Sequence, residues 1–235
     1  MQPIPDEKFA LFALSLPRGH GFGEWIPVGY WGDDRDQTCG VTTRHAVDGS
    51  FGLLALRRRT DQVWVASAEE HDLDSLGLAE ARLSAHLRIG EPPEPVPSGV
   101  APRPSLLDLK GRRPGEVFSL LFQPPRLRGL WALNELYLAL PKPDPNWAGD
   151  CQTANTHTRM WEALLLAALR EQGILVTQPL ESPDFHIRNR LGGEAWVEAV
   201  TANPSERSSH INAPLSEPPL DPEARFFGPA AVRFA

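Results

Sequence analysis

The stretch that most constrains the fold is residues 184–201, because its pattern predicts a tight antiparallel hairpin. The first run, "DFHIR" (184–188), alternates polar with apolar residues, and the second, "EAWVEAVT" (194–201), is apolar on both faces. A Gly-Gly pair at 192–193 supplies a turn between the two runs. Because both of its faces are apolar, we expect the second run to be an inner strand of a sheet.

Each run of this hairpin carries one carboxylate among apolar neighbours, Asp184 in the first and Glu198 in the second. Pairing of the runs is expected to bring the two side chains near each other. Two carboxylates that close repel unless a proton or a divalent cation lies between them. Mg²⁺ takes carboxylate oxygens as ligands, and such an ion can activate water and stabilise a phosphoryl transition state. The alternative is a polar strand edge that faces solvent.

A third carboxylate lies on the helix predicted for residues 156–173. Thr156 or Thr158 is the expected N-cap of this helix, and Gly173 the expected C-terminal stop. Glu162 shares a face with the leucines at positions 165, 166 and 169. A carboxylate on an apolar face is costly to bury unless it is paired or ligates a metal. The alternative is a boundary glutamate that pairs with Arg159 or Arg170.

The order of these acids resembles the PD-(D/E)xK nuclease superfamily. Pro183-Asp184 resembles the PD motif, Glu198 and the residues after it resemble (D/E)xK, and Glu162 resembles the acid on the helix before the core sheet. The stretch 152–204 is similar nearly throughout to a set of uncharacterised bacterial proteins that share "PDF" and "VEAVTxNP". Residues 23–89 resemble them more loosely.

The resemblance implies an α/β fold with a mixed central sheet flanked by helices, as in restriction endonucleases. It also implies one or two Mg²⁺ or Mn²⁺ ions held by Asp184, Glu198, Glu162 and the backbone carbonyl of Ala199. The implied activity is endonucleolytic cleavage of phosphodiester bonds in DNA, in bacterial defence or competition.

The chain departs from the superfamily at one position, because Val200 stands where the lysine belongs, and no lysine follows Lys142. His186, two residues after Asp184 on the same strand face, is the candidate catalytic substitute. Arg207 and His210 are further substitutes, and Gln178 is a possible assisting group. The departure leaves open a catalytically degenerate fold that binds nucleic acid or protein.

The rest of the chain predicts two further parts. Residues 1–89 read as a β-rich N-terminal module that ends in a helix, residues 90–114 as a Pro-rich linker, and residues 115–235 as the nuclease-like core. The strands expected in the module cover residues 9–16, 23–34, 38–59 (two strands) and 61–68, and its helix covers 73–89. In the core we expect a helix from 128 to 140, a loop from 141 to 150 and a short strand at 174–179.

Composition narrows the functional class. The net charge of −7 argues against broad, sequence-blind binding to nucleic acid. Two arginine groups, Arg57 to Arg59 and the arginines between 112 and 128, are the clusters that would favour nucleic acid if they lined the site. The module is the candidate surface for a homodimer or protein partner, through exposed Trp25, Trp31 and Trp64.

The sequence also bears on the cellular setting. Cys39 and Cys151 have neither zinc-site nor disulfide-framework spacing, which favours a cytoplasmic protein. No run of about 18 apolar residues predicts a membrane span. The glycine motifs of nucleotide-binding loops and of serine hydrolases are missing as well.

Overall fold

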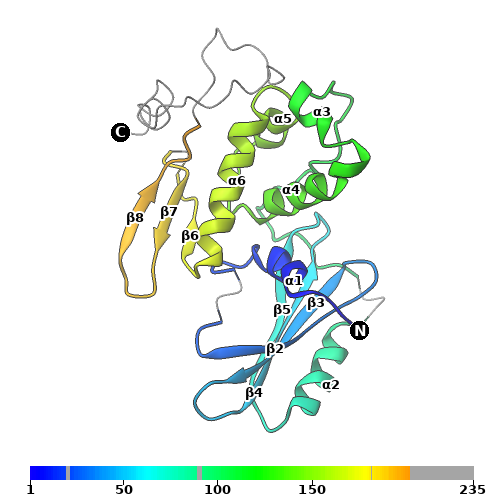
Figure 1. The fold of residues 1–235 in the computed structure, drawn as a ribbon, viewed down its shortest axis with the longest axis vertical. Coiled ribbons are helices and arrows are strands. Elements are labelled where there is room, and N and C mark those ends of the chain that lie inside the picture. The colour runs from blue at the N-terminus through cyan, green and yellow to red at the C-terminus, as the bar shows by residue number, and fades with distance from the viewer. Residues whose placement is uncertain (20–21, 89–91, 181, 202–235) are drawn as a thin grey trace, which may run out of the picture. The chain divides into compact units, whose positions relative to one another are not determined.

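The first part of the chain forms a five-stranded antiparallel sheet in the order β1-β2-β3-β4-β5 (Figure 1). The computed structural model describes residues 1–19, 22–88, 92–180 and 182–201. The strands are β1 (Gln2–Pro3), β2 (Trp25–Gly32), β3 (Thr38–His45), β4 (Phe51–Arg58) and β5 (Trp64–Leu73). The strands predicted between residues 23 and 68 are thereby confirmed, although β5 runs five residues further than expected.

The predicted strand at 9–16 is wrong, because this segment is helical in α1 (Asp6–Ala13). Pro5 stands at the N-cap, and two acidic residues in the first turn suit the positive end of a helix dipole. Phe9, Phe12 and Ala13 are all buried. Their spacing of three and four residues fits a helix, not the alternation of a strand.

The two faces of the sheet pack against different helices. Phe9, Phe12 and Ala13 of α1 pack with Cys39, Val41, Leu56 and Trp64. The helix α2 (Leu76–His86) packs through Ala79 and Leu83 on a second cluster that includes Leu53 and Ala55 of β4. Gly40 permits this approach, because a Cβ there would lie 2.5 Å from the Leu83 side chain and 2.7 Å from the Leu54 carbonyl oxygen. The helix predicted at 73–89 is confirmed over Leu76–His86, whereas Leu73 belongs to β5.

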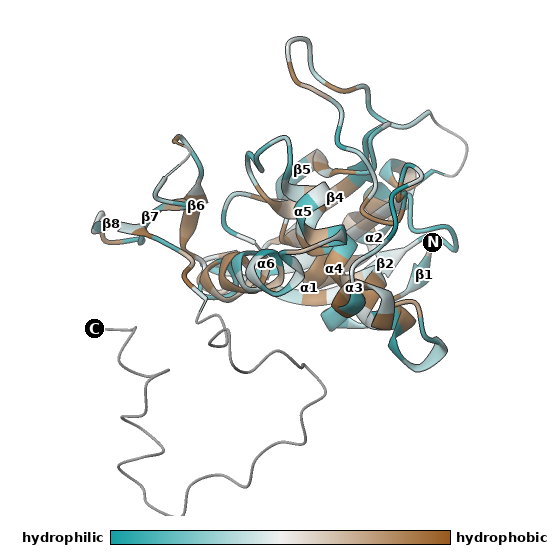
Figure 2. Cartoon of the chain, turned by 90° about the horizontal axis from the view of Figure 1, so that it is seen from above, coloured by the Kyte–Doolittle hydropathy of each residue, from teal (hydrophilic) through white to brown (hydrophobic). Residues whose placement is uncertain are grey.

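Helices dominate the segment that follows the Pro-rich residues. They are α3 (Glu116–Leu120), the 3₁₀ turn η1 (Pro124–Arg126), α4 (Leu127–Ala139), α5 (Trp147–Gln152) and α6 (Thr156–Glu171). The predicted helices at 128–140 and 156–173 are confirmed as α4 and α6. Residues 141–150 were expected to be a loop throughout, but α5 begins inside them at Trp147. Figure 2 shows apolar residues over much of α4 and β6 (Leu175–Thr177).

The ends of α6 are only partly as expected. Asn155 occupies the N-cap without a side-chain hydrogen bond, and the Thr156 hydroxyl instead donates to the Cys151 carbonyl oxygen at 2.8 Å. Gly173 does end the helix, since its φ of +67° lies in the left-handed region that favours glycine. Its amide donates to the Arg170 carbonyl oxygen at 2.8 Å.

A second sheet follows α6, with three antiparallel strands in the order β6-β7-β8. The strand β7 (Phe185–Arg188) pairs with β8 (Glu194–Val197) in the register Phe185 to Val197 and Arg188 to Glu194. This confirms the hairpin. Phe185 and Val176 are buried and belong to the same core as Leu133 and Leu166 of α4 and α6.

Two expectations for this sheet are not met in the described part of the chain. The mixed sheet would need parallel neighbours, and β6, β7 and β8 all pair antiparallel. The inner strand predicted for 194–201 is an edge strand there, since β8 pairs only with β7 and its first three residues are exposed. Apolar composition on both faces did not require a neighbour on both edges.

The described elements up to Ala199 belong to one compact unit. Within this unit, Arg58 of β4 joins Glu135 of α4 through hydrogen bonds of 2.8 and 2.9 Å. Cys39 and Cys151 are free and buried. In the residues described, no helix has both the length and the apolar character needed to cross a membrane.

Candidate functional site

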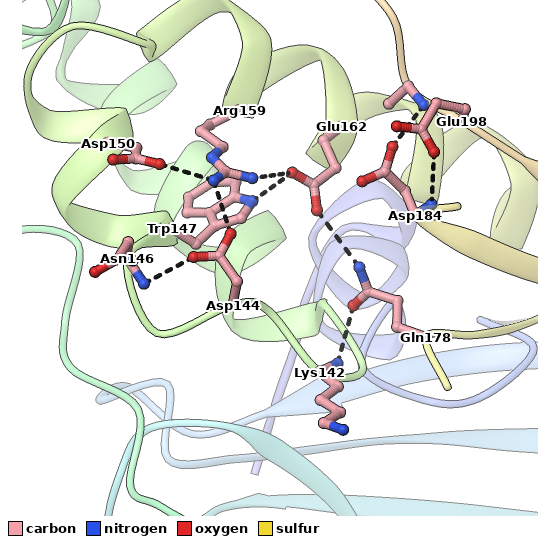
Figure 3. A network of polar contacts seen from close by, with 11 residues as sticks. Lys142, Asp144, Asn146, Trp147, Asp150, Arg159, Glu162, Gln178, Asp184 and Glu198 are labelled. Carbon is pink, nitrogen blue, oxygen red and sulfur yellow. Dashed lines mark hydrogen bonds and ion pairs between the residues drawn. The ribbon is translucent and has the colours of Figure 1, made fainter. Parts of the chain in front are cut away.

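The hairpin brings Asp184 and Glu198 together through reciprocal hydrogen bonds (Figure 3). The amide of Asp184 donates to Glu198 Oε2 at 3.2 Å, and the amide of Ala199 donates to Asp184 Oδ2 at 2.7 Å. Each carboxylate therefore accepts from the backbone of the opposite chain segment. Ser182 Oγ also donates to Glu198 Oε2, at 3.4 Å. These contacts fix both side chains at the open end of the β7–β8 pair.

The local sequence explains this geometry. Phe185 and Val197 are paired across the hairpin, and Phe185 is completely buried. Asp184 precedes Phe185 and Glu198 follows Val197, so this apolar pair sets the position of both carboxylates. Asp184 is half-buried and Glu198 is exposed. Ala199, expected to supply a carbonyl ligand, contacts Asp184 through its amide.

Glu162 lies on α6 and is buried, with 4% of its surface exposed. Its Oε2 accepts a hydrogen bond from Trp147 Nε1 at 2.8 Å and one from Arg159 at 3.1 Å. The ion pair with Arg159, which we considered as the alternative to a metal role, is thus present. Arg170 does not contact Glu162, because it donates to the carbonyl oxygens of Leu14, Ala139 and Val176.

Arg159 is shared among three acids. Its guanidinium lies 2.7 Å from Asp144, 2.8 Å from Asp150 and 3.1 Å from Glu162. The sequence interpretation missed Asp144, Trp147 and Asp150, which it placed in a loop. Local spacing gave no signal for these three residues, because they belong to the segment before α6 and reach Arg159 or Glu162 only in the folded chain.

Gln178 connects Glu162 to the loop after α4. Its Nε2 donates to Glu162 Oε1 at 3.4 Å, and its Oε1 accepts from the Lys142 amide at 2.9 Å. The side chain is buried, so the bonds hold it in one orientation. Gln178 thereby lies beside a predicted site residue, as an assisting group would.

The electrostatic environment links Glu162 with the hairpin. Burial raises the pKa of Glu162, the hydrogen bonds from Arg159 and Trp147 oppose that rise, and the charge of Asp184 adds to it. Figure 3 shows the carboxylate of Asp184 directed toward Glu162. The three predicted acids therefore gather in one region, although they come from α6, the start of β7 and the end of β8.

His186 does not join the carboxylates. Its ring lies 4.6 Å from the Trp196 ring, centroid to centroid, and its Nε2 is 3.5 Å from Glu194 Oε2. The strand register pairs His186 with Trp196. Val200, at the lysine position, is exposed. Arg207 and His210 lie outside the described residues.

The first arginine cluster, Arg57 to Arg59, is used inside the fold. Arg57 and Arg58 are buried, and Arg59 forms a 2.6 Å ion pair with Asp61. The second cluster, Arg112, Arg113, Arg126 and Arg128, is exposed, and within it Arg112 donates to Gln152 and Arg126 to Gln123. The tryptophans proposed for partner binding are not exposed. Trp64 is 2% exposed, whereas Trp25 and Trp31 are half-buried.

The donor set can be tested against a divalent cation. Asp184 and Glu198 offer oxygen ligands side by side, and a small hard ion needs only one or two protein carboxylates and keeps several waters. Within the described residues, no three or more His, Cys, Asp or Glu side chains are grouped as a metal site. Glu162 would have to leave Arg159 to become a third ligand. The pair of Asp184 and Glu198 fits Mg²⁺ or Mn²⁺, whereas Glu162 is engaged by Arg159.

No protein-family model, curated protein or solved structure matches this chain.

Proposed function

We propose that this chain is a divalent-metal-dependent nuclease that cleaves phosphodiester bonds in DNA. The observation that carries the proposal is the reciprocal pair of hydrogen bonds that fixes Asp184 beside Glu198. The passage from α6 through β6, β7 and β8 agrees with a restriction-endonuclease-like core. A setting in bacterial defence or competition remains an expectation of the resemblance.

The residues would divide the work as follows. Asp184 and Glu198, with the carbonyl of Ala199, would hold Mg²⁺ or Mn²⁺, and the ion would supply a Lewis acid and an activated water. Glu162 would complete the acidic site from α6, held in orientation by Gln178. The backbone amides of Asp184 and Ala199 keep the two hairpin carboxylates in place while substrate binds.

A second candidate function is a nuclease-like fold that binds a partner without cleavage. It is favoured by the ion pair that neutralises Glu162 and by Val200 at the lysine position. The internal use of Arg57, Arg58 and Arg59 also removes one of the two arginine clusters that could have bound DNA.

The test is calorimetric titration of Mg²⁺ and Mn²⁺ into the full chain, followed by nicking of supercoiled plasmid and cleavage of single-stranded DNA. Asp184→Asn should lose both metal binding and cleavage. The matched control is Asp74→Asn, an exposed aspartate just before α2, which should lose neither. A folded chain that neither binds metal nor cleaves DNA contradicts the proposal. Metal binding without cleavage of any substrate supports the second candidate.

A further inference from the structure

The geometry around Arg159 raises the question of why a predicted metal ligand is already neutralised. The guanidinium contacts Asp144, Asp150 and Glu162 at 2.7–3.1 Å, so a protein cation occupies the centre of an acidic group (Figure 3). A guanidinium presents five donors in a planar fork, which lets one arginine serve several carboxylates.

The three acids do not depend equally on Arg159. Asp144 and Asp150 are more than a third exposed, so water can solvate them if the arginine leaves. Glu162 is buried and cannot be solvated in the same way. Its remaining donors are the neutral groups of Trp147 and Gln178. Without Arg159, a cation is therefore the partner that Glu162 most lacks.

Arg159 has alternatives as well. Its side chain is 19% exposed, and two of its three acids are at the surface. If it released Glu162, it would keep two ion pairs at Asp144 and Asp150. The exchange would then cost Arg159 one ion pair, and its guanidinium would still be paired with Asp144 and Asp150.

We infer that Arg159 is a positioning residue that competes with a divalent cation for Glu162. When the ion binds at Asp184 and Glu198, Glu162 turns from Arg159 to the ion, and Arg159 stays with Asp144 and Asp150. Without the ion, Arg159 holds Glu162 in place and prevents repulsion between Glu162 and Asp184. This inference rests on the proposed metal site of Asp184 and Glu198.

The test is the Mg²⁺ affinity of the full chain, measured by calorimetry in a double-mutant cycle. Arg159→Met should bind Mg²⁺ about tenfold more tightly than the wild type, a coupling at the low end of linked sites. In the Glu162→Gln background the Arg159→Met substitution should change the Mg²⁺ affinity less than about twofold, because the carboxylate for which Arg159 and the ion compete is gone. A gain that persists in that background overturns the inference, since it would come from charge alone.

Two further variants separate competition from the general field of a positive charge. Lys142→Met removes one positive charge from the loop next to Gln178, and Figure 3 shows its side chain directed away from Glu162. It should change the affinity less than about twofold, because exposed charges are screened. Arg159→Lys keeps the charge but loses the fork, and it should still bind Mg²⁺ several-fold more tightly.

A measurement on the wild type covers the case in which Arg159 variants do not fold. Trp147 Nε1 donates to the same oxygen of Glu162 as Arg159 does. Mg²⁺ should therefore shift the indole N–H resonance of Trp147, with the dissociation constant seen by calorimetry. A resonance that stays fixed at saturating Mg²⁺ overturns the inference.

The failures of the two proposals are distinguishable. Mg²⁺ binding that depends on Asp184 but not on Arg159 leaves the nuclease proposal standing and removes the competition. Binding that appears only in Arg159→Met, and that needs Glu162, supports the competition and contradicts an active metal site in the wild type. No binding in any folded variant contradicts both.

Discussion

Two buried glutamates in this molecule have nearly the same partners and different surroundings. Glu135 of α4 accepts from Arg58 and from the indole of Trp64, and Glu162 of α6 accepts from Arg159 and from the indole of Trp147. Arg58 donates two hydrogen bonds to Glu135, and both side chains are about 95% buried. Arg159 instead divides its donors among three acids and is partly exposed.

The difference indicates which carboxylate is structural. Arg58 also donates to the carbonyl oxygens of Asp36 and Gln62, but the carboxylate that it pairs with is that of Glu135 on α4. Glu162 shares its arginine, and a second carboxylate, Asp184, lies close enough to raise its pKa. An arginine that pairs with one buried carboxylate holds the core together, whereas an arginine that is shared among three carboxylates can exchange partners. Four predictions test this comparison.

The largest effect is expected at Glu135. The Glu135→Gln substitution leaves the guanidinium of Arg58 buried without a counter-charge, so we expect a loss of about 3–5 kcal/mol in the free energy of unfolding. Urea denaturation followed by circular dichroism measures it. Glu171→Gln, at an exposed position near the end of α6, is the control and should stay within about 0.5 kcal/mol. A loss below about 1 kcal/mol would contradict the structural assignment.

Asp61 is another buried carboxylate that accepts hydrogen bonds from arginines, and its contribution to stability depends on pH. Burial alone would raise the pKa of Asp61, but hydrogen bonds from Arg59 and the Arg103 amide outweigh it and lower the pKa. The stabilisation is therefore present above the usual value of 3.8 and is lost as the pH falls through the lowered one. Asp61→Asn should cost about 2 kcal/mol at neutral pH.

The difference between the wild type and Asp61→Asn should narrow as the pH falls below 3.8. Urea midpoints at a series of pH values measure this convergence. A difference that is constant with pH would mean that packing, and not charge, accounts for the loss.

A smaller effect is expected at Glu162. In Glu162→Gln, Arg159 keeps Asp144 and Asp150, and removal of the buried charge offsets the lost ion pair. We expect the free energy of unfolding to change by less than about 1 kcal/mol. Chemical denaturation beside Glu135→Gln gives the comparison directly. Equal losses in the two variants would remove the distinction drawn between the two glutamates.

The smallest effect on the apo protein is expected at Asp184. The Asp184→Asn side chain retains an oxygen that can accept from the Ala199 amide, so the stability without metal should change by about 0.5 kcal/mol or less. Saturating Mg²⁺ should raise the melting temperature of the wild type and leave that of the variant unchanged. A large loss without metal would identify Asp184 as a structural residue.

Local patterns explain which elements could be predicted. The hairpin, α2, α4 and α6 follow from alternation, from helical spacing and from glycine at the turns, all of which lie within a few residues. The same reasoning failed at α1, where Phe9 and Phe12 satisfied both a strand-like composition and a helical spacing. The packing of Phe9 and Phe12 with Trp64 and Val41 shows that the helical spacing is the one that the chain uses.

Partners from distant parts of the chain could not be predicted for the charged groups. Arg58 and Glu135 are 77 positions apart, and Asp150 and Arg159 belong to different helices. The arginine run at 57–59 is typical of a nucleic-acid surface in the sequence, yet Arg58 and Arg59 form ion pairs inside the fold.

The sequence alone predicted that Asp184 and Glu198 lie near each other, because a turn within 20 residues joins the two strand-like runs that carry them, and the structure then set the register of Phe185 opposite Val197. Tertiary structure alone decided that Glu162 lies near them, that Arg159 is shared with Asp144 and Asp150, and that Glu135 pairs with Arg58. A charge acquires its role from the groups that surround it after folding, and those groups come from positions that local spacing does not connect.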